Sequence, residues 1–85
     1  MTTNDVVTLF SRPGCHLCDE ARRGLEKLLR DGARFELREV DIEGDDSLHR
    51  EMLELIPVID VNGVRVVELI FEPDAVLARL DTFVP

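Results

Sequence analysis

Two cysteines, Cys15 and Cys18, lie at the junction between a strand-like run and a helix-like run of this chain. Residues 6–10 are apolar or β-branched and are followed by residues typical of a loop. From Cys15 to about Arg30, apolar side chains recur at helical spacing, with acidic residues in the first turn and Gly32 just past the end. The sequence therefore predicts a strand, a short loop and a helix that begins at the first cysteine.

A second strand is expected at residues 35–42, because the side chains there alternate with a period of two. The alternation places Phe35, Leu37 and Glu39 on one face of the strand. The helix between the first two strands is long enough for a crossover, so these strands should run parallel with a right-handed connection.

The dipeptide Asn62-Gly63 is a strong hairpin signal, because both residues tolerate positive φ. It separates two strand-like runs, residues 57–61 and residues 64–69. The sequence therefore predicts an antiparallel pair at this point, which completes a sheet of mixed direction.

Two further helices are expected. Asp45 or Asp46 can accept hydrogen bonds from the first-turn N–H groups of a short helix, which must end before Pro57. Pro73 suits the first turn of a closing helix, whose apolar positions extend as far as Phe83. The predicted order is β-α-β-α-β-β-α, an α/β fold with a four-stranded mixed sheet flanked by three helices.

Length and charge restrict the classes of function. A chain of 85 residues can close one core, so residues 1–85 are expected to form a single domain. The formal net charge of -8 opposes binding to nucleic acid and to anionic membranes. Residues 1–5 carry neither the basic stretch nor the apolar stretch of a secretion signal. We therefore expect a cytoplasmic protein that binds neither nucleic acid nor membranes.

The spacing of the cysteines favours chemistry over structural cross-linking. In the loop-closure model, a disulfide across so short a loop stabilises a protein by only roughly 2 kcal/mol. Cysteine becomes a nucleophile as the thiolate, and the free N–H groups and partial positive charge at a helix N-terminus favour that form. Cys15 should therefore be a nucleophile of lowered pKa, and Cys18, almost one turn into the helix, should face the sheet.

Two other interpretations of the cysteine pair stay open at this point. Cys15 and Cys18 could supply half of a zinc site or bridge an iron–sulfur cluster between two subunits, but the chain offers only His16 and His49 to complete a site within one molecule. Alternatively, the fold could be a partner-binding scaffold in which the cysteine pair has no redox role. We expect no metal site.

The element order, the Cys-x-x-Cys spacing at the start of the first helix and the pair Ile56-Pro57 before the third strand are together typical of a thioredoxin fold. Within that fold, the chain resembles the glutaredoxins. Residues 9–21, Leu-Phe-Ser-Arg-Pro-Gly-Cys-His-Leu-Cys-Asp-Glu-Ala, are most similar to the small bacterial glutaredoxin-like proteins. The resemblance spans nearly the whole chain.

The resemblance implies a substrate-binding site made of Arg12, His16, Ile56 and Pro57. A cis Ile56-Pro57 bond would pack beside the two sulfurs and leave the preceding backbone free to pair with an extended substrate. Arg12 would lie near the thiolate of Cys15 and the carboxylate of glutathione, and its positive charge would lower the thiol pKa. His16 would stabilise the thiolate when it is an imidazolium.

Other ionisable residues are expected to be structural. His49 lies in the predicted second helix without a cysteine near it in sequence, and Asp41 and Asp60 lie in or at the ends of strands. Leu9 occupies the strand position at which thioredoxins typically carry a buried acid. A proton-shuttling carboxylate is therefore not expected at that position.

The expected activity is thiol–disulfide exchange, in which Cys15 attacks a disulfide and Cys18 resolves the mixed disulfide. The expected partner is a disulfide-containing protein or a low-molecular-weight thiol, and no bound cofactor is expected.

Glutathione is a candidate reductant, but glutaredoxins hold its carboxylate with a Gly-Gly pair followed by an acid, and Val67-Glu68 stands in that stretch. Bulky side chains block the close backbone approach that glycine allows. Glu72 or Asp74 could supply the acid only if the loop is rearranged. A thioredoxin-reductase-type partner is the alternative reductant.

Overall fold

The computed structural model describes residues 5–80. Within that range the chain forms four strands, three α-helices and one short 3-10 helix. In chain order they are β1 (Val6–Ser11), α1 (His16–Arg30), β2 (Glu36–Asp41), η1 (Ile42–Gly44), α2 (Asp46–Met52), β3 (Val58–Val61), β4 (Val64–Glu68) and α3 (Pro73–Leu77). The sheet order is β2-β1-β3-β4; β1 and β2 run parallel, and the other two pairs are antiparallel. The predicted order and mixed sheet are confirmed.

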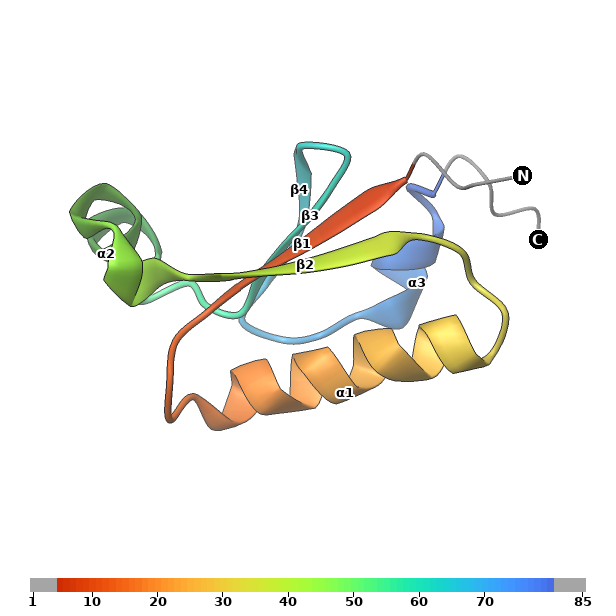
Figure 1. Ribbon diagram of the computed structural model, residues 1–85, viewed down its shortest axis with the longest axis horizontal. Helices are drawn as coiled ribbons and strands as arrows, with labels where there is room; N and C mark the ends of the chain where they lie inside the picture. Colours follow the sequence, from red (N-terminus) through yellow and green to blue (C-terminus); the bar gives the residue numbers. More distant parts are fainter. Residues whose placement is uncertain (1–4, 81–85) are drawn as a thin grey trace.

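One face of the sheet packs on α1 and α3, which lie on the same side of it in Figure 1. Alternate residues of the strands point into this core because side chains in a strand alternate between the two faces. Phe35 and Leu37 contact the same core, so the face of β2 that carries Phe35, Leu37 and Glu39 is the one turned toward α1. The fully or nearly buried residues of this core are Val7, Leu9, Ala21, Leu25, Phe35, Ile59, Val61, Val67, Val76 and Leu80.

A second, smaller core lies at the end of the sheet where β1 leads into α1. α2 and the β1–α1 loop lie at that same end in Figure 1. The buried members of this core are Cys18, Ile42, Met52, Ile56 and Val58, and Cys15 packs against it. The cysteine pair therefore belongs to the structural core that joins the head of α1 to α2.

The hairpin between β3 and β4 has the predicted geometry. Asn62 and Gly63 adopt φ values of 51° and 84°, as a turn with two left-handed residues requires. The Asn62 side chain also accepts a hydrogen bond from the N–H of Val6 at 2.8 Å and donates one to Asp5 at 3.0 Å. This turn therefore also fixes the start of β1.

Several boundaries differ from the prediction. β2 and β3 each begin one residue later than expected, at Glu36 and Val58. β2 ends at Asp41, because the Asp41 carboxylate accepts the N–H of Glu43 at 2.8 Å and starts the 3-10 helix. β4 ends at Glu68, because Leu69 adopts φ 69° and leaves the strand conformation. The closing helix ends at Leu77, earlier than its apolar pattern indicated. Phe83 lies outside the described residues.

Candidate active site

Cys15 and Cys18 form a disulfide at the head of α1, with their Cα atoms 5.2 Å apart. Cys15 is the N-cap residue of the helix, and its Sγ atom accepts a hydrogen bond from the N–H of Cys18 at 3.1 Å. Cys18 is fully buried, as predicted, whereas Cys15 is partly exposed. The first sulfur is therefore the one within reach of a substrate, and a backbone donor already points at it.

The Ile56-Pro57 bond is cis, as the resemblance implied. Pro57 is fully buried, and Ile56 packs in the same small core as Cys18. The N–H of Ile56 donates to the carbonyl of Met52 at 3.0 Å, and the carbonyl of Pro57 accepts from the N–H of Leu69 at 2.9 Å. Of the Ile56 backbone groups, only the carbonyl is thus a candidate partner for an extended substrate.

Arg12 and His16 flank the disulfide, and each is paired with an acid. Arg12 Nε lies 3.7 Å from Glu43 Oε2, and the Arg12 carbonyl accepts the N–H of Cys15 at 3.4 Å. His16 Nε2 lies 3.4 Å from Glu20 Oε1, one turn further along α1, and the His16 side chain is 81% exposed. Both side chains are at the surface, where a substrate can displace these weak pairings.

The stretch in which glutaredoxins hold glutathione carries bulky side chains here, and it is followed by one residue in a glycine-like conformation. Val67 is buried in the core, and Glu68 pairs with Arg65 at 3.1 Å. The next residue, Leu69, has the left-handed φ of 69° that glycine adopts without steric penalty, yet it carries a side chain that is 44% exposed. Because the N–H of Leu69 donates to the Pro57 carbonyl, the backbone of Leu69 lies beside the cis-proline.

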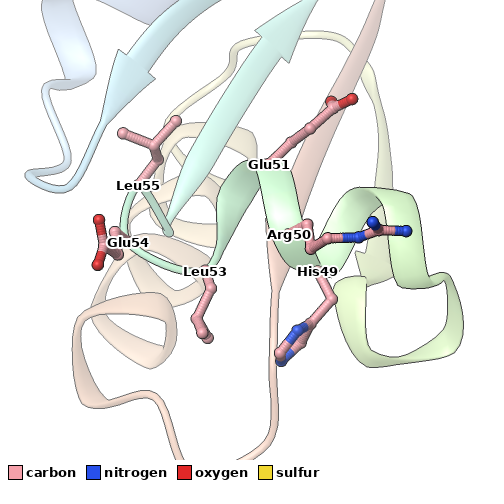
Figure 2. Close-up of a pocket in the computed structure, with 6 residues that line it drawn as sticks. All are labelled: His49, Arg50, Glu51, Leu53, Glu54 and Leu55. Carbon is pink, nitrogen blue, oxygen red and sulfur yellow. The ribbon is translucent and has the colours of Figure 1, made fainter.

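A hollow of about 570 Å³ lies between the end of α2 and the segment that leads into the cis-proline. Figure 2 shows that His49 and Leu53 point to the same side, whereas Arg50 and Glu51 point in other directions. Its lining also includes Glu54 and Leu55. The hollow therefore combines two leucines with ionisable side chains, and its last lining residue, Leu55, directly precedes Ile56.

Three residues near the cysteine loop were missed by the sequence interpretation: Ser11, Arg22 and Glu39. The Ser11 hydroxyl donates to Glu39 Oε2 at 2.7 Å, and Arg22 Nε donates to Glu39 Oε1 at 2.7 Å. The hydrogen bond from Arg22 is the main reason that the pKa of Glu39 lies below its usual value, and the same bond raises the pKa of Arg22. A charged residue on the face that carries Phe35 and Leu37 was the available signal for Glu39.

The residues expected to be structural lie in different parts of the fold. Leu9 is fully buried in the larger core. Asp41 caps η1, and His49 lies in α2. Asp60 lies on β3 with Arg65 Nε at 3.9 Å, and burial raises the pKa of this carboxyl group.

Over residues 5–80, no group of three or more His, Cys, Asp or Glu side chains is arranged to hold a metal ion. Within the same residues, none of the helices has the length and apolar character needed to cross a bilayer.

Residues 6–83 match the family described as Glutaredoxin-like domain (DUF836). A solution structure of a protein from Nitrosomonas europaea is 25% identical, with a TM-score of 0.78 over 95% of this chain and 96% of that one. An X-ray structure of a protein from X. campestris is 34% identical, with a TM-score of 0.65 over 93% of this chain and 99% of that one. A glutaredoxin from Brucella melitensis is 28% identical, with a TM-score of 0.50 over 85% and 74% of the two chains. No curated protein matches the chain significantly.

Proposed function

Because the chain belongs to the glutaredoxin-like domain family, we propose that it is a thiol–disulfide oxidoreductase that cycles Cys15 and Cys18 between dithiol and disulfide. The observation that carries this proposal is the asymmetry of the pair. Cys15 is partly exposed at the helix N-cap, whereas Cys18 is fully buried one turn below it. An attacking thiol must meet its substrate, and a resolving thiol needs only to reach the first sulfur.

In the proposed reaction, the Cys15 thiolate attacks one sulfur of a substrate disulfide. A bond forms between Cys15 Sγ and that sulfur, and the other substrate sulfur leaves as a thiolate. Cys18 then loses its proton and attacks Cys15 Sγ, which releases the second substrate thiolate and forms the Cys15–Cys18 disulfide. Two electrons pass from the protein to the substrate, so an external reductant must return two electrons to the disulfide.

The N–H of Cys18 supports the first step. It lies 3.1 Å from Cys15 Sγ in the disulfide form, and a thiolate at the same place would accept a stronger, charge-assisted hydrogen bond. The N-terminus of α1 adds its partial positive charge. Both effects favour the thiolate over the thiol and would lower the pKa of Cys15.

The proposed site places substrate binding beside the cis-proline. The Ile56 carbonyl, Pro57, Arg12 and His16 surround the exposed side of the pair in this proposal. The proposed partners are a disulfide-containing protein as substrate, or a low-molecular-weight thiol that returns electrons to the Cys15–Cys18 disulfide. The proposed compartment is the cytoplasm, where thiols are kept reduced. Glutathione is a poor reductant in this proposal, because Val67-Glu68 stands where glutaredoxins carry a Gly-Gly pair, and Leu69, which follows with a positive φ, adds another bulky side chain. A thioredoxin-reductase-type protein is the alternative reductant.

Single cysteine variants test the order of attack. In a disulfide-reduction assay, Cys15→Ser should abolish turnover, because no attacking thiol remains. Cys18→Ser should instead hold a substrate in a mixed disulfide on Cys15, which mass spectrometry of the trapped complex would locate. If substrate were trapped on Cys18 of the Cys15→Ser variant and not on Cys15 of the Cys18→Ser variant, the assignment would be reversed.

Two further results of the same work would overturn the proposal. One is a wild-type protein that forms no mixed disulfide and no reversible internal disulfide in redox buffers. The other is stoichiometric zinc or iron in the anaerobically purified protein together with full protection of both thiols, which would favour the metal-binding interpretation.

A further inference from the structure

Ser11, Glu39, Arg22 and Asp19 form one hydrogen-bonded network that joins β1, β2 and α1. Ser11 is 3% exposed and donates to Glu39, and Arg22 binds Glu39 through both its Nε and Nη2 atoms. Arg22 Nη1 also donates to Asp19 Oδ1 at 2.8 Å. A single guanidinium therefore bridges two carboxylates that come from different elements.

The network borders the Cys15 segment on two sides. Ser11 is the last residue of β1, and residues 12–14 run from it to Cys15. On the other side, the N–H of Asp19 donates to the Cys15 carbonyl at 3.1 Å. A hollow of about 210 Å³ lies between these parts, and its lining residues are Ser11, Arg12, Pro13, Gly14, Asp19, Arg22, Glu39 and Asp41.

The charged residues of the network lie within about two helical turns of Cys15 in sequence. Arg22 is seven positions after Cys15, which corresponds to about 10 Å along the helix axis, and Asp19 is four positions after it, at about 6 Å. Arg22 leaves the network with one net negative charge, and without Arg22 it would carry two. Arg22 holds the pKa of Glu39 below its usual value, which keeps Glu39 ionised at neutral pH in the intact network.

We propose that Arg22 is a positioning residue that controls the reactivity of Cys15 by neutralising Glu39 and Asp19 beside the cysteine loop. The inference rests on the proposed function, since it concerns the same thiol. Glu39 and Ser11 hold the guanidinium in place and tie the end of β1 to it. The glutamate thus has two opposite effects: it orients Arg22, and it adds a negative charge of its own.

The test measures how fast iodoacetamide alkylates Cys15 in the reduced full-length protein between pH 5 and pH 9, with peptide mass spectrometry to separate the two cysteines. Arg22→Gln should slow alkylation at pH 6 by about two- to fivefold, the effect of one charge at roughly 10 Å when the effective dielectric constant is about 35 to 80. Glu39→Gln should accelerate it by a similar factor. Arg22→Lys, which keeps the charge but loses the two-pronged contact, should recover most of the wild-type rate.

Arg23→Gln is the matched control, because Arg23 is an exposed neighbour on the same helix and has no part in the network. It should change the rate much less than Arg22→Gln. The other charged or titratable groups around the cysteine loop are unchanged in every variant: Arg12, His16, Glu20, Asp41, Glu43 and, from α2, His49 with Arg50.

Opposite signs for the Arg22 and Glu39 variants, with rates that converge at high pH where every thiol is ionised, would support the proposal. Changes of the same sign in both variants, or changes that persist at high pH, would overturn it, because they indicate altered access to the sulfur. If Arg22→Gln unfolds, the other two variants test the proposal. Glu39→Gln must then accelerate alkylation, and Arg22→Lys must keep most of the wild-type rate. A wild-type protein without a reversible disulfide would defeat the proposed function instead, whatever these variants show.

Discussion

Gly24 lies in the interior of α1, where alanine ordinarily stabilises a helix by about 1 kcal/mol over glycine. Here Phe71, in the loop before α3, packs against this position. An added Cβ would overlap the ring at Cε2 and would lie 2.7 Å from Cδ2 and 2.9 Å from Cζ. Overpacking of this kind costs roughly 2 kcal/mol. Gly24→Ala should therefore lower the free energy of unfolding by about 1 kcal/mol, the difference between the two effects.

The sign should reverse once the ring is removed. In a Phe71→Ala background no ring atom meets the new methyl group, so Gly24→Ala should raise the free energy of unfolding by about 1 kcal/mol. The coupling between the two positions would then be about 2 kcal/mol. Because Phe71 follows Leu69 and Ile70, this contact also ties the loop beside the cis-proline to α1.

Urea unfolding of the four oxidised proteins measures both effects and their coupling, provided that the slope with urea stays constant. Gly44→Ala is the control, because nothing lies within 4 Å of a Cβ at that position. Its effect should stay within about 0.5 kcal/mol. If Gly24→Ala had the same sign and size with and without the Phe71 ring, the contact would not be the reason that glycine occupies this position.

Three other changes have signed outcomes. Asp60→Asn should stabilise the protein at neutral pH, because burial raises the pKa of the Asp60 carboxyl group in the folded state and so opposes its ionised form. The wild type therefore gains stability as the pH falls through the folded-state pKa. The urea midpoints of the two proteins should converge below pH 3.8, the ordinary pKa of the group. Replacing Glu68 and Leu69 together by glycine should speed reduction of the Cys15–Cys18 disulfide by glutathione several-fold, because glycine allows close approach to the backbone. Chromatography of the oxidised and reduced proteins would follow the reaction. Rapid reduction of the wild-type protein by glutathione would contradict this prediction. Ser11→Ala should lower the free energy of unfolding by about 1 kcal/mol in urea, through the lost bond to Glu39, and an unchanged midpoint would show that the bond contributes nothing.

The parts of the fold that depend on local sequence were predictable. The helix that follows the cysteines, the turn at Asn62-Gly63 and the parallel first pair of strands all follow from spacing, positive φ and crossover length. The burial of Cys18 also follows from its place one turn into the helix. The cis bond before Pro57 came only from the resemblance to a family, because an isolated Ile-Pro pair is usually trans.

The features that sequence could not give depend on contacts between distant segments. Arg22 and Glu39 are 17 positions apart, and nothing in their local patterns pairs them. Phe71 reaches Gly24 across the core, so the local preference for alanine in a helix gives the wrong expectation there. The 3-10 turn after Asp41 depends on one side-chain bond to Glu43, which ended the strand earlier than its alternation indicated.

The central claim is that Cys15 and Cys18 exchange two electrons as one unit. Its most direct test is an equilibrium titration of the full-length protein in buffers of defined thiol–disulfide potential, with alkylation and mass spectrometry to count free thiols. We predict that both thiols disappear together. The titration should have a slope of about 30 mV for each tenfold change in the ratio of oxidised to reduced protein. Two independent titrations, or a pair that stays reduced at every potential tested, would contradict it.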